Sequence, residues 1–524
     1  MSHSDNEENT PLVVEEKKTQ KESWKNSIVL RTASFATNGL FFAGHVLLNG
    51  KYLSSMGTEG ASASALVSSA QAVIVGLSLG CVLPLGLFFG EALGKQEYKA
   101  AGDIAKTATV LSGLLGIFAA SAMWSTRGIF PLIFEEETAK IAFDFFTGYA
   151  PTAIPLLFII VGPQIAFQEG EWYIPPASMF SVLGISGIFS YLLGFTANLR
   201  ALGIGLGGTI GSSLSALILG LWFFLRQNYD KYDFFSLSVQ GFSKKIKDLL
   251  TAGWKLSLQR LTEWGNLFLI TTVIGAESNN DLKALNPAMM YLILFGTTMQ
   301  GCAQAAGMII SKNKGAINKA QESNLPTQES QEIVTACHRN NIKTIIVGNF
   351  FGVILNMVIG VSFYLARAPL AHFYLSQESS DDITNLAEKL LWVNMLGLIP
   401  DACRIISAGA LRGWQDFLYP TIISFIMMTA IGVPVGYGFG KLFNDPPGVM
   451  SYIRCLTMLL ADIFILLRCF NQVKNDEKKF EAFLLPESKT SLCFSFLKKE
   501  NDIPTSAINE NDPTKSKTSP CNLL

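Results

Sequence analysis

Two acidic residues lie inside strongly apolar stretches, where a carboxylate could bind and release a proton or a small cation. Glu263 lies in GWKLSLQRLTEWGNLFLITTVIG and Asp401 in LLWVNMLGLIPDACRIISAGAL. Each is ten residues from one end of its stretch, Gly253 or Leu411. At a rise of ~1.5 Å per residue, both acids lie ~15 Å deep, near the middle of a bilayer. A charge at that depth is costly and indicates a functional site. We therefore predict that Glu263 and Asp401 form an ion- or proton-coupling site.

An arginine lies one helical turn from each acid. Arg260 precedes Glu263 by three residues and Arg404 follows Asp401 by three, so each can pair with its acid along one helix face. Such pairing would hold both acids ionised, which would weaken a proton switch or convert the site into one that binds an anion. Asp462, in the last apolar stretch, is expected to neutralise one arginine. The alternative is a structural ion-paired cluster that never titrates.

The elements that carry these residues are predicted to be membrane-spanning helices. The chain is 49% hydrophobic and 15% charged, whereas charged residues make up about 25% of a soluble domain. Apolar stretches of 18 or more residues indicate spanning helices. We predict an all-α membrane protein with about twelve spans, near 27–48, 63–93, 107–130, 142–168, 174–198, 202–226, 249–275, 286–311, 343–366, 388–411, 418–441 and 450–470.

The polar segments between these spans divide the chain. We expect a polar tail (1–26), a six-helix lobe (27–226), a linker (227–248), a second six-helix lobe (249–470) and a disordered tail (471–524). One set of alternate loops, including 94–106, 226–247 and 312–343, is rich in Lys and Arg and should be cytoplasmic. Both tails and the linker are then cytoplasmic. The protein is expected in a plasma or inner membrane, with an endomembrane as the alternative.

Three stretches carry a resemblance to a known family: GEALGKQEYKAA (90–101), GIGLGGTIGSSL (203–214) and DACRIISAGALRGWQD (401–416). They resemble the multidrug and toxic compound extrusion (MATE) family, over residues 27–470. The resemblance implies a V-shaped, two-lobed transporter that exports solutes against H⁺ or Na⁺. It also implies that a Glu in helix seven and an Asp in helix ten couple ion flow to transport. Glu263, ten residues after Gly253, and Asp401, eleven before Arg412, match these positions.

The first half departs from that family. The acid of the family's first helix falls on Asn49, and His45 lies four residues earlier on the same helix face. His45 could titrate in place of the missing acid, because its unperturbed pKa is near ~6.5. The alternative is a packed histidine that donates to a backbone carbonyl.

We thus expect a multi-pass secondary active transporter, a multidrug antiporter that exports amphipathic, cationic organic solutes or xenobiotics in exchange for H⁺ (or Na⁺). A lipid or oligosaccharide flippase and a non-transporting scaffold or sensor are the alternatives. We expect no enzyme activity, no metal site and no cofactor beyond the coupling ion. The expected partners are a small-molecule substrate and membrane lipid, not nucleic acid, and the protein should be a monomer. The terminal CNLL makes Cys521 a candidate for prenylation, unless the match arises by chance.

Overall fold

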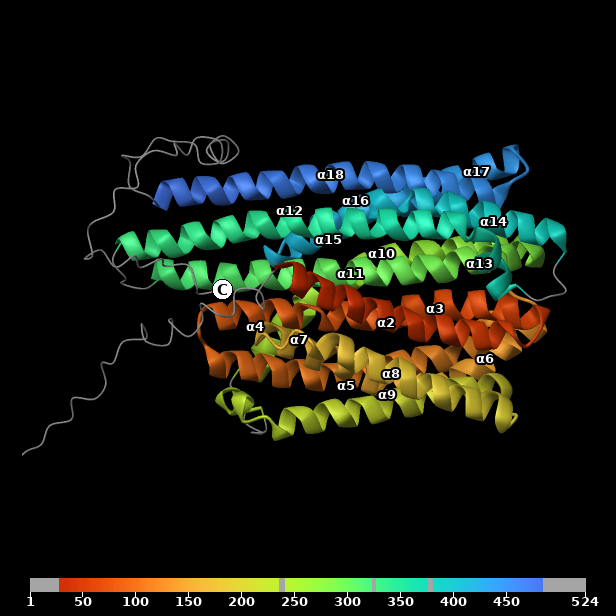
Figure 1. Cartoon of the computed structure of the whole chain (residues 1–524), viewed down its shortest axis with the longest axis horizontal. Helices are drawn as coiled ribbons and strands as arrows, with labels where there is room; N and C mark the ends of the chain where they lie inside the picture. The colour runs from red at the N-terminus through yellow and green to blue at the C-terminus, as the bar shows by residue number, and fades with distance from the viewer. Residues whose placement is uncertain (1–27, 235–240, 323–326, 376–379, 484–524) are drawn as a thin grey trace, which may run out of the picture.

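The computed structural model describes residues 28–234, 241–322, 327–375 and 380–483, which are helical with no β-strand. The helices form twelve rods, some of which consist of two helices that follow one another end to end (Figure 1). The first six are α2 (Ile28–Ser54), α3 (Thr58–Val82) with α4 (Pro84–Gly94), α5 (Tyr98–Ile129), α6 (Glu136–Tyr149) with α7 (Ala153–Gln168), α8 (Ile174–Tyr191) and α9 (Arg200–Leu225). The second six are α10 (Phe242–Glu277), α11 (Asn279–Glu322), α12 (Thr327–Leu365), α14 (Asp381–Leu396) with α15 (Leu398–Gly413), α16 (Leu418–Ser424) with α17 (Gly432–Leu442), and α18 (Pro446–Phe483). The short helix α13 (Arg367–Tyr374) follows α12.

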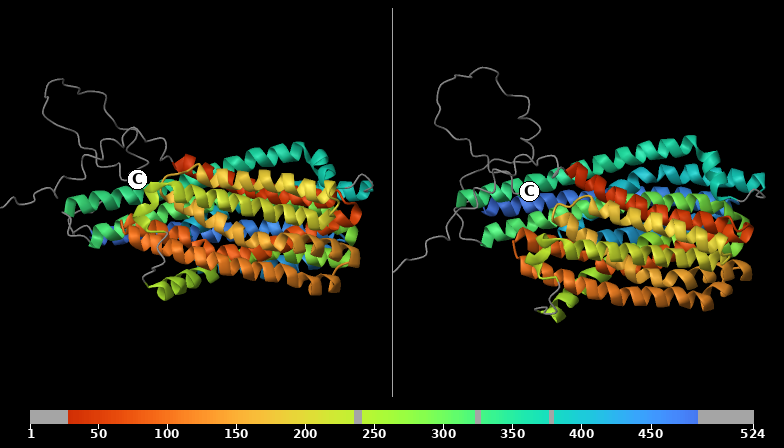
Figure 2. Two further views of the ribbon diagram at one scale, coloured as in Figure 1. Left: turned by 90° about the horizontal axis from the view of Figure 1, so that it is seen from below. Right: turned by 60° about the horizontal axis from the view of Figure 1, so that its bottom comes forward.

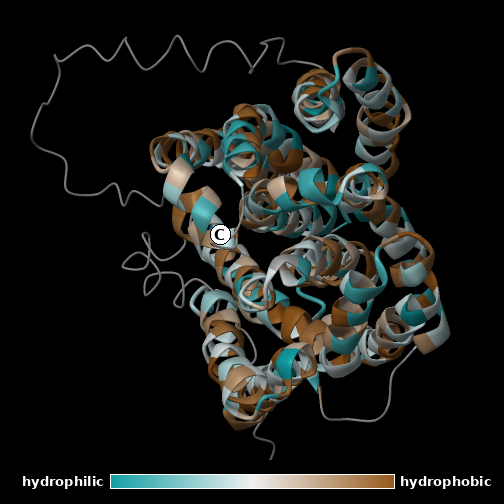
Figure 3. Ribbon diagram, turned by 90° about the vertical axis from the view of Figure 1, so that its right-hand side faces the viewer, coloured by the Kyte–Doolittle hydropathy of each residue, from teal (hydrophilic) through white to brown (hydrophobic). Residues whose placement is uncertain are grey.

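The rods are those of an integral membrane protein. Eight are long and apolar enough to cross a membrane, and α14 with α15 makes a ninth. The other three are α2, α10 and α18, of which α10 and α18 contain buried charged residues. The rods lie side by side along the long axis (Figure 2). Many large hydrophobic side chains are exposed, and lipid would contact them. Figure 3 shows the bundle from one end, with its hydrophobic residues coloured brown. The predicted all-α membrane class is confirmed.

The two halves of the chain meet along four central helices. α3 packs on α10 and α2 packs on α11, with the rest of each half on the outer side (Figure 1). The backbones approach closely where glycine faces the partner helix. A Cβ on Gly39 would lie 2.2 Å from the carbonyl oxygen of Thr297, and one on Gly80 would lie 2.4 Å from the Cα of Ser257. Small residues at such contacts are typical of helix packing in membranes.

The fourth and tenth rods are broken at matching places, whereas the π-helical segments of the fifth and eleventh rods lie at different places. The fourth rod is interrupted by a 3₁₀ turn (Ala150–Thr152) and the tenth bends by 44° between α14 and α15. The fifth rod ends in a π-helical segment (Leu192–Thr196), and the eleventh contains one (Phe425–Ile431). Single π-helical turns occur frequently at functional sites. The breaks of the fourth and tenth rods are what an internal repeat of six helices would produce.

The turns after the fourth and tenth rods are also alike. Gly170 has φ 89° and Gln415 has φ 68°, the left-handed conformation that often ends a helix. The amide of Gly170 donates to the carbonyl of Phe167 at 3.0 Å, and that of Gln415 to Arg412 at 2.9 Å. The sequences at these turns, FQEGEWYIPP (167–176) and LRGWQDFLYP (411–420), are also alike, since each contains a Gly, a Trp, an acid and a Pro.

Several helix ends differ from the sequence-based limits. α10 begins inside the expected linker, α18 continues past 470 to Phe483, and α11 and α12 together cover most of the expected 313–342 loop. Hydropathy marks where a helix leaves the membrane, not where it ends, and these segments are rich in the helix formers Lys, Glu, Gln and Ala. The domain limits themselves stay predictions. Residues 1–27 and 484–524, with Cys521, lie outside the described residues.

Candidate functional site

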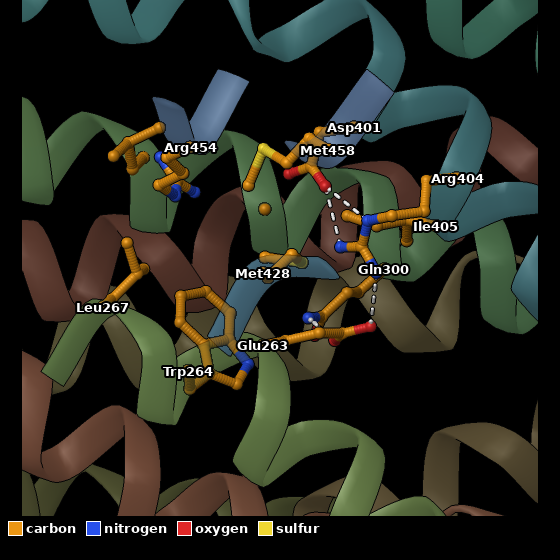
Figure 4. Close-up of a pocket in the computed structure, with 12 residues that line it drawn as sticks. Glu263, Trp264, Leu267, Gln300, Asp401, Arg404, Ile405, Met428, Arg454 and Met458 are labelled. Atoms are coloured by element: carbon orange, nitrogen blue, oxygen red, sulfur yellow. Dashed lines mark hydrogen bonds and ion pairs between the residues drawn. The ribbon is translucent and has the colours of Figure 1, made fainter. Parts of the chain in front are cut away.

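Arg404 joins the two predicted acids. On α15, Asp401 Oδ1 accepts hydrogen bonds from Arg404 Nη2 at 2.7 Å and Nε at 2.9 Å. Arg404 Nη1 reaches across to α10 and donates to Glu263 Oε1 at 3.2 Å. Figure 4 shows the guanidinium between the two carboxylates. One guanidinium therefore joins Glu263 of α10 to Asp401 of α15.

Glu263 is surrounded by donors. Arg260 Nη1 donates to Oε2 at 3.2 Å, and Gln259 Nε2 donates to Oε1 at 3.1 Å. Gln300 Nε2 on α11 donates to Oε2 at 3.2 Å. With Arg404, four side chains contact a carboxylate that is only 6% exposed. An ionised carboxylate accepts and does not donate, so this arrangement suits the ionised form.

Asp401 lies just after a break between two helices. α14 ends at Leu396 and α15 begins at Leu398, so Asp401 lies in the first turn of a new helix. Pro400 has no N–H to continue the backbone ladder, which favours a break here. A carboxylate near a helix N-terminus is stabilised by the helix dipole. The sequence contains the signals for this break, Gly397 and Pro400, but the continuous span predicted at 388–411 missed it.

The π-helical segment borders the same site. Ser424, just before this segment, accepts a hydrogen bond from Arg404 Nη1 at 3.2 Å. Within the segment, the carbonyl of Met428 accepts from Asn266 Nδ2 at 2.8 Å. The site therefore draws on α10, α11, α15 and the rod that contains α16.

The other buried charges of the second half make no ion pair with this network among the described residues, although Arg454 lines the same cavity. Arg454 Nη1 donates to Asn394 Oδ1 at 3.1 Å. Asp462 makes no ion pair within 4 Å in the part of the chain that the structure describes, and its buried Oδ1 has no hydrogen-bond partner. The expectation that Asp462 pairs with an arginine is thus not met, because Arg404 is already held by Glu263 and Asp401. Arg412, which the sequence reasoning used only to place Asp401, is buried and lacks an ion pair among the described residues.

The first half contains a polar network whose hydrogen-bonded members, among the described residues, include no acid, lysine or arginine. His45 Nε2 lies 3.3 Å from Tyr149 Oη and 3.3 Å from Asn49 Nδ2. Tyr149 Oη also accepts from Gln71 Nε2 at 2.8 Å. His45 thus contacts side chains of its own half rather than a carbonyl, and its Nδ1 is buried without a partner. Whether it titrates stays a prediction.

Two cavities share a wall near the middle of the bundle. One lies between the halves and is lined by Phe42 and Gln71 from the first half and by Trp264 and Gln300 from the second. The other is lined by Glu263 and its acid–arginine network, and again by Trp264 and Gln300. We call them the central cavity and the charged cavity.

The sequence alone did not identify three residues that line these cavities. Gln71 lines the central cavity, and Trp264 and Gln300 line both. Each glutamine is a polar residue inside a long apolar stretch. A polar residue within a spanning segment typically faces the bundle interior, so this signal was present.

Comparisons with known proteins agree with this architecture. Residues 339–438 match the family model described as MatE. A probable multidrug resistance protein NorM of Synechococcus sp. is 24% identical over 420 residues, 78% of this chain and 84% of the relative. A probable NorM of Xylella fastidiosa is 22% identical over 384 residues, 69% of this chain and 74% of the relative.

Two solved structures share the fold. The eukaryotic MATE transporter AtDTX14 superposes with a TM-score of 0.74 at 14% identity, covering 89% of this chain and 99% of that one. A MOP superfamily transporter from Pyrococcus furiosus, whose binding pocket is described as having reverse polarity, superposes with a TM-score of 0.71 at 17% identity, covering 86% and 96%.

Proposed function

Because the chain belongs to the MATE family of multidrug efflux transporters, we propose that it is a secondary active transporter that exchanges an organic solute for H⁺ or, as the alternative, Na⁺. It acts as a monomer, with both tails in the cytoplasm and the outer helix faces in lipid. The ion binds in the charged cavity of the second half, and the solute binds in the central cavity.

The central cavity has the composition of a solute site. Its wall is mostly apolar, with the aromatic rings of Phe42 and Trp264, and a few polar groups from Gln71, Gln300 and Thr297. Ligand pockets are typically apolar with a small number of placed polar groups. Because both halves contribute, a relative movement of the halves would open the cavity and release a bound solute.

The observation that carries the coupling proposal is the hydrogen bond from Gln300 to Glu263. Gln300 lines both cavities, so a change at Glu263 changes the wall of the solute site. Protonation of Glu263 or Asp401 would remove a charge that holds Arg404. The bridge between α10 and α15 would then weaken, and ion binding would favour one arrangement of the helices over another.

Proteoliposomes containing the purified protein test this proposal. Uptake of radiolabelled benzoate and of tetraphenylphosphonium, an anionic and a cationic probe, is measured under an imposed pH gradient and under an imposed Na⁺ gradient. We expect the pH gradient to drive one probe. If neither probe shows gradient-driven uptake or counterflow, the protein is not a transporter of this kind.

One observation favours a second candidate, a non-transporting scaffold or sensor. Glu263 is fully paired, as expected of a structural charge cluster. Counterflow separates the two candidates, because a scaffold exchanges no probe across the membrane.

A further inference from the structure

Asp462 of α18 is a buried acid that the network around Glu263 does not use. It is only 6% exposed. Among the residues that the structure describes, it makes no ion pair, and its Oδ1 has no hydrogen-bond partner. Glu263 and Asp401, by contrast, each pair with an arginine. Because ionisable residues inside spanning helices usually mark an ion pathway or a proton relay, Asp462 is a candidate for such a role.

Asp462 lies on the face of α18 that meets α15. Arg454 and Met458, eight and four residues earlier on the same face, line the charged cavity (Figure 4). Ile465, three residues later, belongs to one hydrophobic cluster with Ala408 of α15. Asp462 is therefore beside α15, on the side of the charged cavity that is predicted to face the cytoplasm.

The charges on α15 do not neutralise Asp462. Arg404 and Asp401 both act on it electrostatically, but in opposite senses, because one is a cation and the other an anion. All three nitrogens of Arg404 already donate to other groups. Cys403 is a further titratable neighbour on this helix. No arginine is thus free to pair with Asp462 through α15 in this arrangement of the described residues.

The other helices that pack on α18 also leave this acid without a counter-charge. From α10, the buried charges are Arg260 and Glu263, which pair with each other. Tyr419 of α16 donates to a backbone carbonyl of α18, and Arg412 of α15 borders leucines of the first half. The remaining charged or titratable residues of the packed helices lie nearer the ends of the rods, at 244, 245, 247, 248, 255 and 277 in α10, 329, 332, 337, 338, 339, 343 and 364 in α12, 381, 382, 388 and 389 in α14, and 437 and 441 in α17.

Burial without a counter-charge favours the protonated form of Asp462. A carboxylate ion that is buried and unpaired costs far more free energy than the neutral acid. A bound water would satisfy Oδ1 with a hydrogen bond, but it would not supply the missing positive charge. Glu263 and Asp401 are in the opposite situation, because arginines hold both in the ionised form. The second half thus combines two ionised acids with a neutral one.

The same interior can also hold Asp462 in its ionised form. It contains four arginines, at 260, 404, 412 and 454, and three acids, at 263, 401 and 462. An arginine that turned toward Asp462 would supply the counter-charge, and the proton would then leave. Arg404 is the candidate for this movement, because it acts on Asp462 electrostatically and has its other acids, Asp401 and Glu263, on neighbouring helices.

We propose that Asp462 is a further proton-binding residue of the exchange, linked to Asp401 through Arg404. This inference rests on the proposed exchange of solute for H⁺ and deepens it. When Asp401 takes a proton from water on the outer side, it loses its hold on Arg404. Arg404 then turns to Asp462, whose carboxyl releases its proton to water on the cytoplasmic side. One proton enters and one leaves, so the net charge of the interior is the same before and after the step.

The same movement reaches the wall of the solute site. Arg404 Nη1 donates to Glu263 at 3.2 Å, and Gln300, which lines both cavities, donates to the same carboxylate. When Arg404 turns away, Glu263 keeps Arg260 and Gln259 but loses the bridge to α15. The movement of a proton is thus linked to the packing of the helices around the central cavity.

Infrared difference spectroscopy of the purified full-length protein in nanodiscs tests the protonation states directly. A protonated carboxyl has a carbonyl stretching band that a carboxylate lacks. At neutral pH we expect this band in the wild type and its loss in Asp462→Asn. Asp401→Asn, which imitates the protonated form of Asp401, should weaken the same band, because Arg404 is then free to pair with Asp462.

Transport by the same variants in proteoliposomes tests the role in coupling. The probe is whichever of benzoate and tetraphenylphosphonium the wild type carries. Asp462→Asn should lower uptake driven by a pH gradient at least about tenfold relative to counterflow, since counterflow requires no net movement of protons. Asp462→Glu keeps a group that binds a proton and should retain part of the gradient-driven uptake.

The matched control is Asp416→Asn. Asp416 also follows α15, but its Oδ2 pairs with Nε of Arg468 at 2.8 Å, so it is ionised and takes no part in the proposed step. This variant should keep the carboxyl band of the wild type and the same ratio of gradient-driven uptake to counterflow.

An unchanged band in Asp462→Asn, or a wild-type ratio of gradient-driven uptake to counterflow in that variant, would overturn the assignment. An equal loss of both kinds of transport would do so as well, because it would indicate a structural role, and so would exchange driven by Na⁺ and not by H⁺. A band of wild-type strength in Asp401→Asn would exclude the link through Arg404.

The band requires neither a solute nor a gradient, so the two proposals fail separately. A band that is lost in Asp462→Asn, in a protein that shows no counterflow, would count against the proposed function alone. Gradient-driven transport by the wild type, with an unchanged band in Asp462→Asn, would count against the role of Asp462 alone.

Discussion

The two halves have matching helix breaks and matching turns, yet their interiors differ in charge. In the first half, His45, Asn49, Tyr149 and Gln71 form a chain of polar contacts without an acid. In the second half, the network around Glu263 is built from acids and arginines. The repeat therefore supplies the same scaffold twice, and side-chain identity decides what each copy does.

Both networks reach the central cavity through a glutamine. Gln71 donates to Tyr149 in the first half and Gln300 donates to Glu263 in the second. Only in the second half does that glutamine contact a group whose charge changes on binding a proton or cation. We infer that ion coupling lies in the second half and that the first half mainly shapes the solute site.

The largest effect is expected from neutralising the acids. Glu263→Gln and Asp401→Asn should each reduce gradient-driven uptake in proteoliposomes to the level of empty liposomes, because the side-chain volume is kept and the ion-binding charge is lost. His45→Gln in the first half is the matched control and should keep gradient-driven uptake. Loss of coupling in His45→Gln, or its retention in both acid variants, would reverse the inferred division of roles.

A large effect on stability is expected from Arg404→Gln. Breaking a buried ion pair by removing one partner costs about 3–5 kcal/mol, since a buried charge is left without compensation. Adding Asp401→Asn should recover much of that loss, because Glu263 keeps Arg260. Thermal unfolding in detergent measures both variants. Arg468→Gln, at an ion pair whose arginine side chain is 41% exposed, is the control and should change stability by about 1 kcal/mol or less. An Arg404→Gln protein as stable as this control would show that the bridge contributes nothing.

A smaller effect on stability is expected from removing a hydrogen-bonding group in the polar network of the first half. Tyr149→Phe removes the hydroxyl that Gln71 and His45 share, and leaves a buried amide donor unpaired. The expected cost is about 1–3 kcal/mol by thermal unfolding, with gradient-driven transport retained. A loss of coupling here would mean that the first half takes part in ion binding after all.

The smallest perturbation tests whether the repeated turns face the same side. Two cysteine substitutions are placed at exposed positions of the equivalent turns: Tyr173→Cys, just before α8, and Leu418→Cys, at the first residue of α16. A third, Leu132→Cys, lies at the opposite end of the bundle. In a background that lacks the eight native cysteines, an impermeant maleimide applied to intact cells should label only Leu132→Cys. Labelling of Tyr173→Cys or Leu418→Cys from outside would overturn the predicted orientation.

The sequence by itself determined the class of the protein, the number of rods and the two acids that are candidates for ion coupling. These features depend on hydropathy and on residue spacing along single helices, which are local properties. The ion pairs of Arg260 with Glu263 and of Arg404 with Asp401 follow from the same three-residue spacing.

Only the tertiary structure decided which residues meet across helices. The second contact of Arg404, to Glu263 on α10, joins residues 141 positions apart. Three further features depend on how the helices are rotated and on where α14 and α15 bend. They are the position of Gln300 in the walls of both cavities and the absence of an ion pair, among the described residues, at Arg412 and at Asp462. Hydropathy reports that a segment is buried in a membrane and not which face meets which neighbour, because apolar residues cover every side of such helices. The rotation of each helix is set by close packing against its neighbours, and that packing exists only in the folded chain.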